Sequence, residues 1–347
     1  MSDMTLDRAA IAAAARLLEQ GKLVAFPTET VYGLGADAEN PQAVAAIYAA
    51  KGRPANHPVI VHLAPEGDIG YWAVSIPAEA RKLIDAFWPG PLTLILKRAV
   101  HIPDAVSGGQ DSIGLRCPSH PVAQALLREF KSGRGGLAAP SANKFGHVSP
   151  TTAQHVQDEF GEPQQGQGPL AAILDGGQSD VGIESTIVDL SRMASHGPVL
   201  LRPGHISPQQ IAEVIGSMPA LPDAAAPRAS GTLEAHYAPA TPVALVQSHD
   251  LAETVRCLAN GGKRAAVMRR GESEPVGALA QLVLPSEPAA YAHELYAALR
   301  EMDAAAADII LVETPPADAA WQGVNDRLRR AAHDSTGVLA SLLRPKS

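Results

Sequence analysis

The sequence lacks the patterns of several large protein classes. Only two of its 347 residues are cysteines, Cys117 and Cys257, and their wide separation favours free thiols in a reducing compartment over a disulfide framework. The histidines include no H-E-x-x-H pattern and no pairing with cysteine, so we expect no structural zinc site. No apolar run approaches the roughly 18 residues that span a membrane, and the opening residues have the pattern of an amphipathic helix. We therefore expect a cytoplasmic protein without a membrane partner.

The common catalytic loops are also missing. No G-x-x-x-x-G-K-[ST] is present for a phosphate-binding loop, no G-x-G-x-x-G for a dinucleotide and no G-x-S-x-G for a serine nucleophile. Chemistry that depends on positioning and charge, without a covalent nucleophile, fits this sequence better.

A basic surface is missing as well. The net charge is −8, and it is negative both in the first 215 residues and in the remainder. Because proteins that bind nucleic acid on their own usually contain a basic domain, the balance argues against an RNA-binding module. A local basic cleft stays compatible with the sequence, so the RNA-binding module is kept as the alternative function.

The elements that are present indicate an α/β protein. Strands and helices alternate early and the later part is richer in strands, which predicts a twisted mixed sheet. Helices are expected from Thr5 to Gly21, from an Asn40 cap to Lys51–Arg53, over 77–90, over Val122–Phe130, and from Ser149–Pro150 onward. Strands are expected at Leu23–Phe26, Pro58–Leu63, Leu92–Lys97, Ser112–Pro118, Leu137–Asn143, and in "AAILDGG", "STIVDL" and "VLLRPG".

The composition changes after residue 215. Residues 216–240 are rich in Pro, Ala, Ser and Gly and have no apolar periodicity, which is typical of a linker. Residues 241–347 alternate strands and helices again, which predicts a second α/β unit with a parallel sheet. We expect a domain over 1–215, a linker over 216–240 and a smaller domain over 241–347.

Two basic residues stand where a predicted helix ends. Lys51 and Arg53, in "KGRP", suit the helix dipole as a solvated last turn. They could also turn toward one point beside the sheet, where an arginine fork and a lysine charge suit a polyphosphate. The residues alone leave both interpretations open.

Polar residues follow or interrupt other apolar strands. Ser141 and Asn143 come directly after a strand, and Ser149 is expected to cap the next helix, whose N-terminus would favour an anion. The same residues also suit an ordinary turn and cap. Arg116 interrupts the strand "SIGLRCP", and a buried arginine usually has an anionic partner, either a structural carboxylate or a ligand.

Taken together, these motifs resemble one family. "FPTETVYGLG", "KGRP" with "HPVIVHL", "IGLRCP", "APSANKFGHVSPTT", "IESTIVDL" and "LRPGHIS" have the order and spacing of the YrdC-like domain, and "AHYAP" with the tail through "NDRLRRAA" resembles its longer subtype. The resemblance covers nearly the whole chain. It implies a twisted mixed-sheet YrdC-like domain followed by a smaller Rossmann-like α/β domain, with the linker folding over the active site.

The resemblance also implies an activity. Members of this subtype join L-threonine, bicarbonate and ATP into L-threonylcarbamoyladenylate and release pyrophosphate, for the modification of adenosine 37 in tRNA. It implies Mg²⁺ with ATP, downstream tRNA threonylcarbamoyl-transfer machinery as the receiver of the product, and no need for direct tRNA binding. A carbamoyl-transfer relative is a remote alternative, because such proteins carry zinc-finger cysteines that this sequence lacks.

The family's site residues map onto this sequence one by one. The resemblance assigns the catalytic positive charges to the side chains of Lys51 and Arg53. The resemblance assigns ATP contacts to Lys51, Arg53, His57, Ser112, Ser141, Asn143, Ser149, Arg202, His236 and Tyr237. It assigns threonine contacts to Thr30, His62, Arg116, Ala139 and Ser185.

Overall fold

The computed structural model describes residues 6–163, 168–233, 236–271 and 277–344. The chain divides into two compact units. The first consists of Met1–Phe145, Pro150–Asp180 and Glu184–Thr232, and the second of Gly146–Ser149, Val181–Ile183 and Leu233–Ser347. The linker predicted over 216–240 therefore contributes to both units, and each unit is described by itself.

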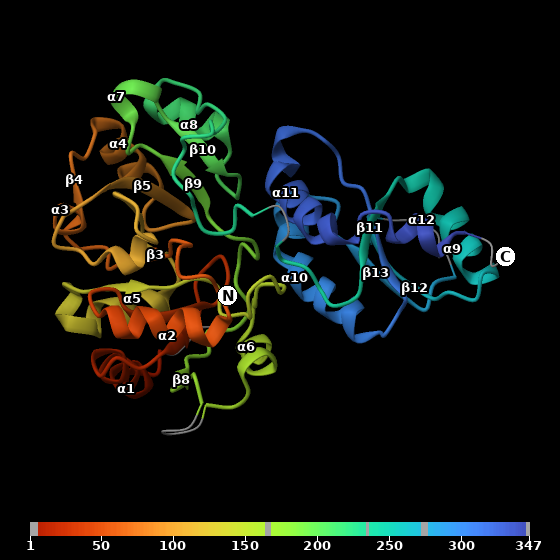
Figure 1. Ribbon diagram of the computed structural model, residues 1–347, viewed down its shortest axis with the longest axis horizontal. Coiled ribbons are helices and arrows are strands. Elements are labelled where there is room, and N and C mark those ends of the chain that lie inside the picture. The colour runs from red at the N-terminus through yellow and green to blue at the C-terminus, as the bar shows by residue number, and fades with distance from the viewer. Residues whose placement is uncertain (1–5, 164–167, 234–235, 272–276, 345–347) are drawn as a thin grey trace. The chain divides into compact units, whose positions relative to one another are not determined.

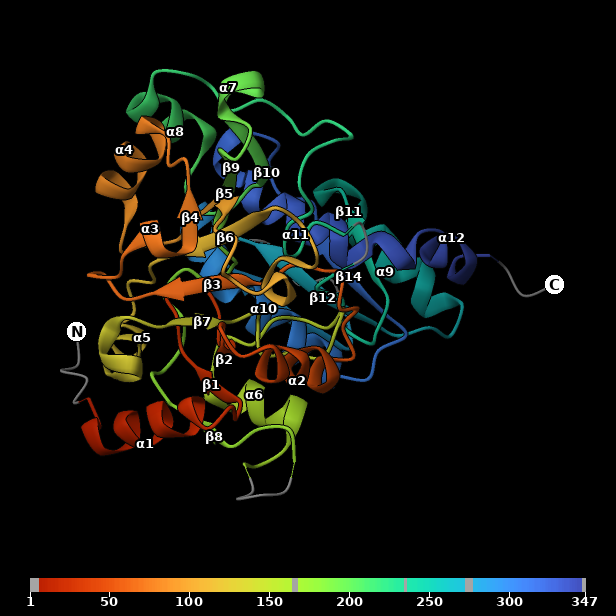
Figure 2. The same cartoon turned by 60° about the vertical axis from the view of Figure 1, so that its left-hand side comes forward.

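The first unit is built on one large mixed sheet. Within the described residues its strands are β1 (Val24–Phe26), β2 (Gly33–Asp37), β3 (Ile60–Leu63), β4 (Ala73–Val74), β5 (Leu92–Arg98), β6 (Ser112–Arg116), β7 (Gly136–Ala138), β8 (Ala172–Ile173), β9 (Thr186–Asp189) and β10 (Val199–Arg202). They lie in the order β10-β9-β5-β6-β3-β7-β2-β1-β8, with β4 beside β5. Figure 2 shows the strands from β5 to β8 in this order from top to bottom. The pairs β5–β9, β3–β6 and β1–β8 are parallel and the other pairs are antiparallel. This confirms the prediction of a mixed sheet.

Helices cover the sheet, and Figure 1 labels them. They are α1 (Arg8–Glu19), α2 (Pro41–Lys51), α3 (Ile69–Trp72), α4 (Ala78–Phe87), α5 (Pro121–Glu129), α6 (Ala153–Phe160), α7 (Met193–His196) and α8 (Pro208–Ile215). The largest apolar core joins α2, α4 and α8 to alternate residues of the central strands, such as Val61, Leu94 and Leu115. Since side chains alternate along a strand, the residues between them face the other side of the sheet. There α1 and α5 pack on Val24, Phe26 and Leu137 at one end.

Helix α2 ends as its sequence predicts. The Asn40 side chain accepts hydrogen bonds from the backbone at its start, and Pro41 occupies the first helical position. Gly52 follows the helix in the left-handed conformation, with φ of 65°, which glycine adopts without strain. This sharp stop lets the chain turn directly after Lys51.

Three local predictions were wrong. Helix α1 is capped by Asp7 and begins at Arg8, while Thr5 lies outside the described residues. The strand expected over 137–143 ends at Ala138, because Pro140 donates no hydrogen bond and the chain bends into a turn. Ser149 does not cap a helix: α6 begins at Ala153, and the Thr152 side chain accepts the capping bond from His155.

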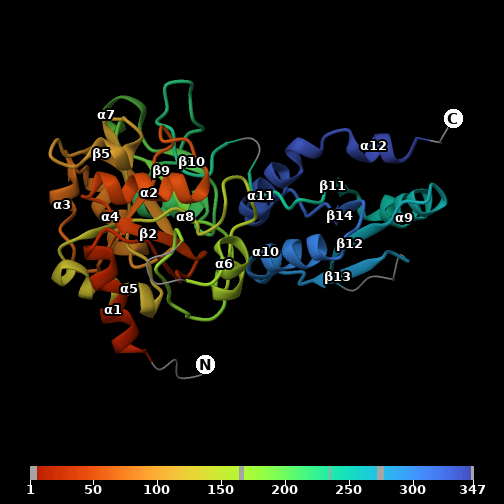
Figure 3. The ribbon, with the colours of Figure 1, turned by 60° about the horizontal axis from the view of Figure 1, so that its bottom comes forward.

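The second unit contains a smaller parallel sheet. Its described strands are β11 (Val243–Val246), β12 (Ala265–Arg270), β13 (Ala280–Leu284) and β14 (Ile309–Glu313), in the order β11-β14-β12-β13, which Figure 3 shows from top to bottom. All three pairings are parallel, which confirms the predicted parallel sheet. The helices are α9 (Leu251–Asn260), α10 (Pro288–Ala304), α11 (Gln322–Ala332) and α12 (Val338–Leu342). Nowhere in the described part of either unit is a helix long and apolar enough to cross a lipid bilayer.

Candidate functional site

The first unit gathers polar side chains on the sheet face opposite its main core. His62 of β3 and Arg116 of β6 are neighbours in register, and Thr93 of β5 lies on the same face by the alternation of its strand. All three residues are buried. Buried polar side chains on one sheet face need partners, and loops following the strands supply them.

The loop between β1 and β2 is held by its own threonines. Thr28 Oγ1 accepts hydrogen bonds from the backbone N–H groups of Thr30 and Val31, and it lies 2.9 Å from Thr30 Oγ1. The N–H of Ala142 donates to the carbonyl of Tyr32, which joins this loop to the turn that follows β7. The loop therefore fixes the Thr30 side chain next to the 139–143 turn.

Lys51 points into the same turn. Its Nζ donates to the carbonyl oxygen of Ser141 at 2.6 Å and to that of Asn143. Burial and the neighbouring Arg53 guanidinium lower the pKa of the Lys51 ammonium well below its usual range. An anion bound here would favour the charged form, so the position suits a phosphate.

A second set of contacts links Arg53 to the far strands of the sheet. Arg53 Nη2 lies 3.4 Å from Ser230 Oγ, and Arg202 Nη1 donates to the Ser230 carbonyl at 2.7 Å. Arg202 also donates to the Ser185 carbonyl, and Ser185 Oγ lies 2.7 Å from Thr93 Oγ1. The structure thus connects Arg53, Arg202 and Ser185, which are far apart in the sequence, through hydrogen bonds to Ser230 and Ser185. All three were predicted to belong to the site.

The first part of the predicted linker lies across this face. Ala226 and Ala229 pack on an apolar patch that includes Ile60 and Ile95. Gln110 and Arg228 exchange hydrogen bonds between the Gln110 side chain and the Arg228 backbone. Sequence reasoning did not single out Ser230, because a lone serine in a flexible-looking segment carries no signal of its own.

Arg116 has a structural carboxylate partner. Its Nη2 donates to Glu29 Oε1 at 2.5 Å, and the N–H of Ser119 donates to Glu29 Oε2 at 3.0 Å. Both members of this ion pair are buried. Glu29 entered the sequence analysis only within the motif "FPTETVYGLG". The signal available was a carboxylate between two threonines, directly after a buried strand. Arg116 Nη1 makes no hydrogen bond to any described residue, so the guanidinium keeps a face for a ligand.

His62 is a neutral side chain at the centre of the site. Burial and the Arg116 cation lower the pKa of its imidazole from 6.5 to about 3. Its Nδ1 is buried without a hydrogen-bond partner among the described residues. His62 therefore offers a neutral, oriented nitrogen to whatever binds next to Arg116.

This shift predicts how acid affects the fold. In the unfolded chain the pKa of His62 is 6.5, so above this pH the imidazole is neutral in both the folded and the unfolded protein. Between pH 6.5 and about pH 3 only the unfolded protein binds a proton at His62, which favours unfolding. His62 should therefore lower the free energy of unfolding by about 1 kcal/mol for each pH unit below 6.5. We expect the difference in unfolding free energy between wild type and His62→Gln to shrink by about 1 kcal/mol between pH 7 and pH 5.5.

The measurement is histidine NMR with His62→Gln to assign the missing resonance. The His62 signal should stay at its neutral position from pH 8 down to pH 5. A midpoint near the ordinary imidazole value would show that the ring is neither desolvated nor facing a cation.

The remaining residues predicted in this unit lie around these contacts. Ala139 is buried, and its N–H donates to the Ile60 carbonyl at 2.9 Å. His57 follows Arg53 and its ring lies 5.6 Å from the Phe145 ring; burial and the cation of Arg53 lower its pKa.

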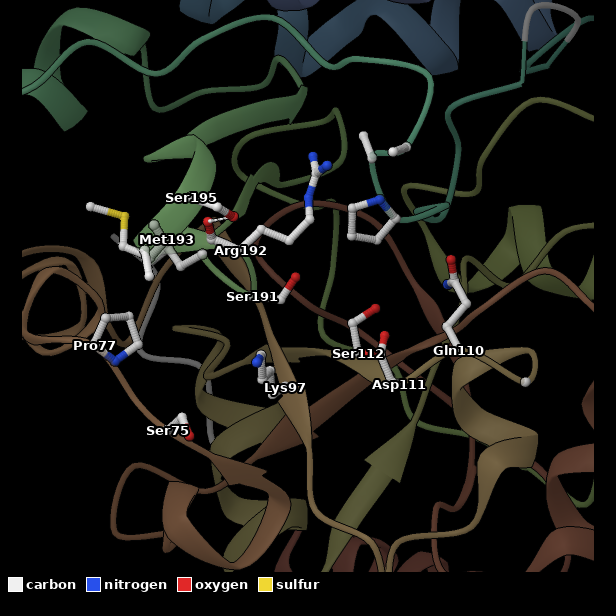
Figure 4. A pocket seen from close by; sticks show the side chains of 16 residues that line it. Ser75, Pro77, Lys97, Gln110, Asp111, Ser112, Ser191, Arg192, Met193 and Ser195 are labelled. Atoms are coloured by element: carbon white, nitrogen blue, oxygen red, sulfur yellow. Dashed lines mark hydrogen bonds between the residues drawn. The ribbon is translucent and has the colours of Figure 1, made fainter.

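Ser112 lines a pocket of about 830 Å³ at the outer end of the same strands. Figure 4 shows Lys97, Ser112 and Ser191 on its walls, with Arg192 beside them. Arg192 is held by Asp189 and Asp223. The pocket lining includes Ser112 and the linker residues Ala226 and Pro227, but none of the other predicted site residues.

Three predicted residues belong to the second unit. Ser149 is fully buried there. Tyr237 is buried with φ of 62°, its ring 4.1 Å from that of His236, and the Arg327 guanidinium lies 5.5 Å from its ring centre. The N–H of His236 donates to the Arg330 carbonyl at 3.4 Å. This motif is thus fixed by α11, the helix of "NDRLRRAA".

Gly204 offers a test of how Ser185 is positioned. A Cβ on Gly204 would lie 2.6 Å from the Thr186 nitrogen and 2.7 Å from the Glu184 carbonyl oxygen, so Gly204→Ala must displace the segment that holds Ser185. We expect it to destabilise the first unit by about 1–3 kcal/mol and to lower activity. Gly261→Ala is the control, because its Cβ would lie 3.3 Å from the Leu258 carbonyl oxygen, a much smaller overlap. If Gly204→Ala and Gly261→Ala had the same Tm, Gly204 would not be needed to position Ser185.

Similarity to known proteins agrees with this geometry. A family model described as "Telomere recombination" matches residues 16–204, and one described as "Threonylcarbamoyl-AMP synthase, C-terminal domain" matches residues 206–333. The threonylcarbamoyl-AMP synthase of Pyrococcus abyssi is 38% identical over 92% of this chain and 93% of its own. That of Bacillus subtilis is 40% identical over 93% of this chain and 92% of its own.

Solved structures agree as well. The structure of P. abyssi Sua5 complexed with L-threonine matches with a TM-score of 0.85 at 36% identity, covering 95% of this chain and 96% of that chain. The family models and relatives span both units, which confirms the resemblance seen in the sequence. The chain therefore belongs to the family of threonylcarbamoyl-AMP synthases.

Proposed function

We propose that this chain synthesises L-threonylcarbamoyladenylate from L-threonine, bicarbonate and ATP, with release of pyrophosphate. The observation that carries the proposal is the set of buried cations in the first unit, in a chain of this family: Lys51 at the 141–143 turn, Arg53 and Arg202 at Ser230, and Arg116 on the sheet face. The product would supply the group that modifies position 37 of tRNA. Downstream threonylcarbamoyl-transfer machinery would receive it, so no direct tRNA binding by this chain is required.

The reaction explains why cations are needed. The threonine amine and bicarbonate condense to an N-carboxylate with loss of water. Its oxygen then attacks the α-phosphorus of ATP, a P–O bond to the β-phosphate breaks, and pyrophosphate leaves. Two anions must meet, so positive side chains that hold them in line lower the barrier. Lys51, Arg53 and Arg202 would hold the phosphates, and Ser141 and Asn143 would bind the nucleotide.

The threonine end would lie next to Arg116. The guanidinium has a nitrogen available for the carboxylate, and Thr30, His62 and Ser185 supply uncharged polar groups around it. Because His62 is neutral at physiological pH, it would not repel a threonine amine. Contacts of ATP with His57, Ser112, Ser149, His236 and Tyr237 stay predictions from the resemblance.

Mg²⁺ would enter with ATP. The described residues contain no group of three or more His, Cys, Asp or Glu side chains that could hold a metal ion. Lys51 donates to the Ser141 and Asn143 carbonyls and Arg53 lies beside Ser230 Oγ, and these cations suit phosphates that carry their own metal ion. When bound, Mg²⁺ would neutralise phosphate charge. Cys117 and Cys257 are both free thiols, which supports the cytoplasm as the compartment.

The linker would cover the reacting groups. Residues 226–230 already contact the site face through Ala226, Ala229 and Ser230 within the first unit. A segment in this place would exclude water from a labile adenylate.

The test is pyrophosphate release from ATP by the purified chain. We expect release, with an AMP-linked product, only when threonine and bicarbonate are both present. Pyrophosphate release that does not depend on threonine would contradict the proposal. The matched control is a degassed buffer without bicarbonate, in which no release is expected.

A further inference from the structure

Gln110 connects the predicted linker to the body of the first unit. Its side-chain Nε2 donates to the Arg228 carbonyl oxygen at 3.1 Å, and its Oε1 accepts a hydrogen bond from the Arg228 N–H at 2.7 Å. These are the two hydrogen bonds that a paired residue of a neighbouring antiparallel strand would make. Figure 4 shows Gln110 on the wall of the pocket that the linker residues Ala226 and Pro227 also line. One side-chain amide therefore holds the linker by its backbone.

The backbone of Gln110 is itself held in place. It follows a short 3-10 helix over Asp104–Ser107. Ser107 is fully buried, and its hydroxyl donates to the Gln110 carbonyl oxygen at 2.8 Å. The Arg98 Nε donates to the same oxygen at 3.2 Å, which ties Gln110 to the end of β5. Gln110 is thus a fixed point to which a less regular segment is attached.

The linker has little regular structure of its own at this point. Residues 226–230 form neither a helix nor a strand, and Arg228 is exposed. Its Nη2 donates to the Gly108 carbonyl at 3.1 Å, in the same loop as Gln110. Ala226 and Ala229 pack on the sheet face, but methyl groups bury little apolar surface. The hydrogen bonds from the Gln110 amide should therefore contribute a large part of the free energy that holds this segment.

The held residue lies two positions before Ser230. Ser230 Oγ is 3.4 Å from Arg53 Nη2, and the Ser230 carbonyl oxygen accepts a hydrogen bond from Arg202 Nη1 at 2.7 Å. Two residues of extended chain span about 7 Å, so the position of Arg228 limits where Ser230 can lie. The guanidinium groups of Arg53 and Arg202 are thus oriented in part by the segment that Gln110 holds.

We propose that Gln110 is a positioning residue for ATP binding. It holds the Arg228 backbone and thereby keeps Ser230 against the two arginines proposed to bind the phosphates. Arg116, proposed to bind threonine, is held by Glu29 instead, so threonine binding should not depend on Gln110. This inference rests on the proposed function, and the first of the two measurements that test it needs neither ATP nor turnover.

The first measurement is the rate at which trypsin cleaves the full-length protein after Arg228. Gln110→Ala removes both hydrogen bonds. Gln110→Glu keeps the size and one acceptor, but it places a carboxylate oxygen, which has no proton to donate, against the Arg228 carbonyl. We expect cleavage to be at least about fivefold faster in both variants, because the segment opens more often.

Mass spectrometry follows the fragment that ends at Arg228, and Arg228→Gln assigns it. Gln154→Ala is the matched control. Gln154 is an exposed residue of α6 whose amide donates to Asp158 at 2.9 Å, far along the chain from the linker. This variant should be cleaved after Arg228 at the wild-type rate.

The second measurement is the affinity of the same proteins for ATP with Mg²⁺ and for L-threonine, each by calorimetric titration without the other substrate. We expect the Kd for ATP to rise at least about fivefold in both Gln110 variants, and the Kd for threonine to stay within about twofold of wild type. A general loss of structure would instead weaken the binding of both ligands and lower the Tm.

Two results would overturn the inference. One is cleavage after Arg228 at the wild-type rate in both Gln110 variants, which would show that Gln110 does not hold the linker. The other is faster cleavage with an unchanged Kd for ATP, which would show that the held segment does not position the two arginines. A wild-type protein that binds no ATP would overturn the proposed function, and with it the role in ATP binding, while the cleavage rates would still show whether Gln110 holds the linker.

Discussion

Alanine in place of Lys51 or Arg53 is expected to lower the turnover of threonine-dependent pyrophosphate release by at least about a hundredfold. Both side chains are buried beside the turn and the linker residue that border the site: Lys51 contacts the Ser141 and Asn143 carbonyls, and Arg53 contacts Ser230. Each supplies a positive charge where two anionic reactants must approach. In the transition state negative charge shifts toward the leaving pyrophosphate, so the loss should appear in kcat as well as in KM for ATP.

Matched variants separate charge from structure. Lys51→Met keeps the length of the side chain without its charge, and it should be as slow as Lys51→Ala. Arg53→Lys keeps the charge but loses the planar fork, and it should retain intermediate activity. Lys82→Ala, an exposed lysine on α4, is the control. Near-normal turnover in both Lys51→Ala and Arg53→Ala would place the reaction elsewhere.

The second large effect is expected from the buried ion pair of Arg116 and Glu29. Arg116→Ala leaves the Glu29 carboxylate buried with only the Ser119 N–H as a donor, which should cost about 3–5 kcal/mol of stability. It also removes the group proposed to bind the threonine carboxylate. We therefore expect a large rise in KM for threonine, with a much smaller change in KM for ATP.

Two measurements distinguish these effects. Thermal unfolding reports the ion pair, and saturation curves for the two substrates report the ligand contact. Arg116→Ala combined with Glu29→Gln should recover part of the stability, because no unpaired charge stays buried, yet it should not recover threonine saturation. If Arg116→Ala alone had wild-type stability and wild-type KM for threonine, both roles of Arg116 would be wrong.

Some of this structure follows from local rules. Asn40, Pro41 and Gly52 define the ends of α2 through capping and backbone preference, so the place of Lys51 at the helix end could be predicted. The mixed sheet and the parallel second sheet follow from how strands and helices alternate. The site residues themselves came from the family resemblance, since the motifs alone left ordinary turns and caps equally open.

Other features depend on tertiary contacts that no local pattern encodes. Ser149 and Thr152 are both good capping residues three positions apart, and the helix begins after the second. Glu29 could not be assigned to Arg116 because 87 residues separate them and the strand order decides which loop meets which strand. Ser230 is likewise placed by the apolar contacts of Ala226 and Ala229 and not by its own sequence context.

The most direct test of the central claim is a crystal structure of this chain with L-threonine and an ATP analogue that cannot release pyrophosphate. The account predicts phosphate oxygens within hydrogen-bond distance of Lys51 and Arg53, and the threonine carboxylate on Arg116, in the same cavity. Phosphates that contact neither Lys51 nor Arg53, or threonine bound away from Arg116, would contradict it.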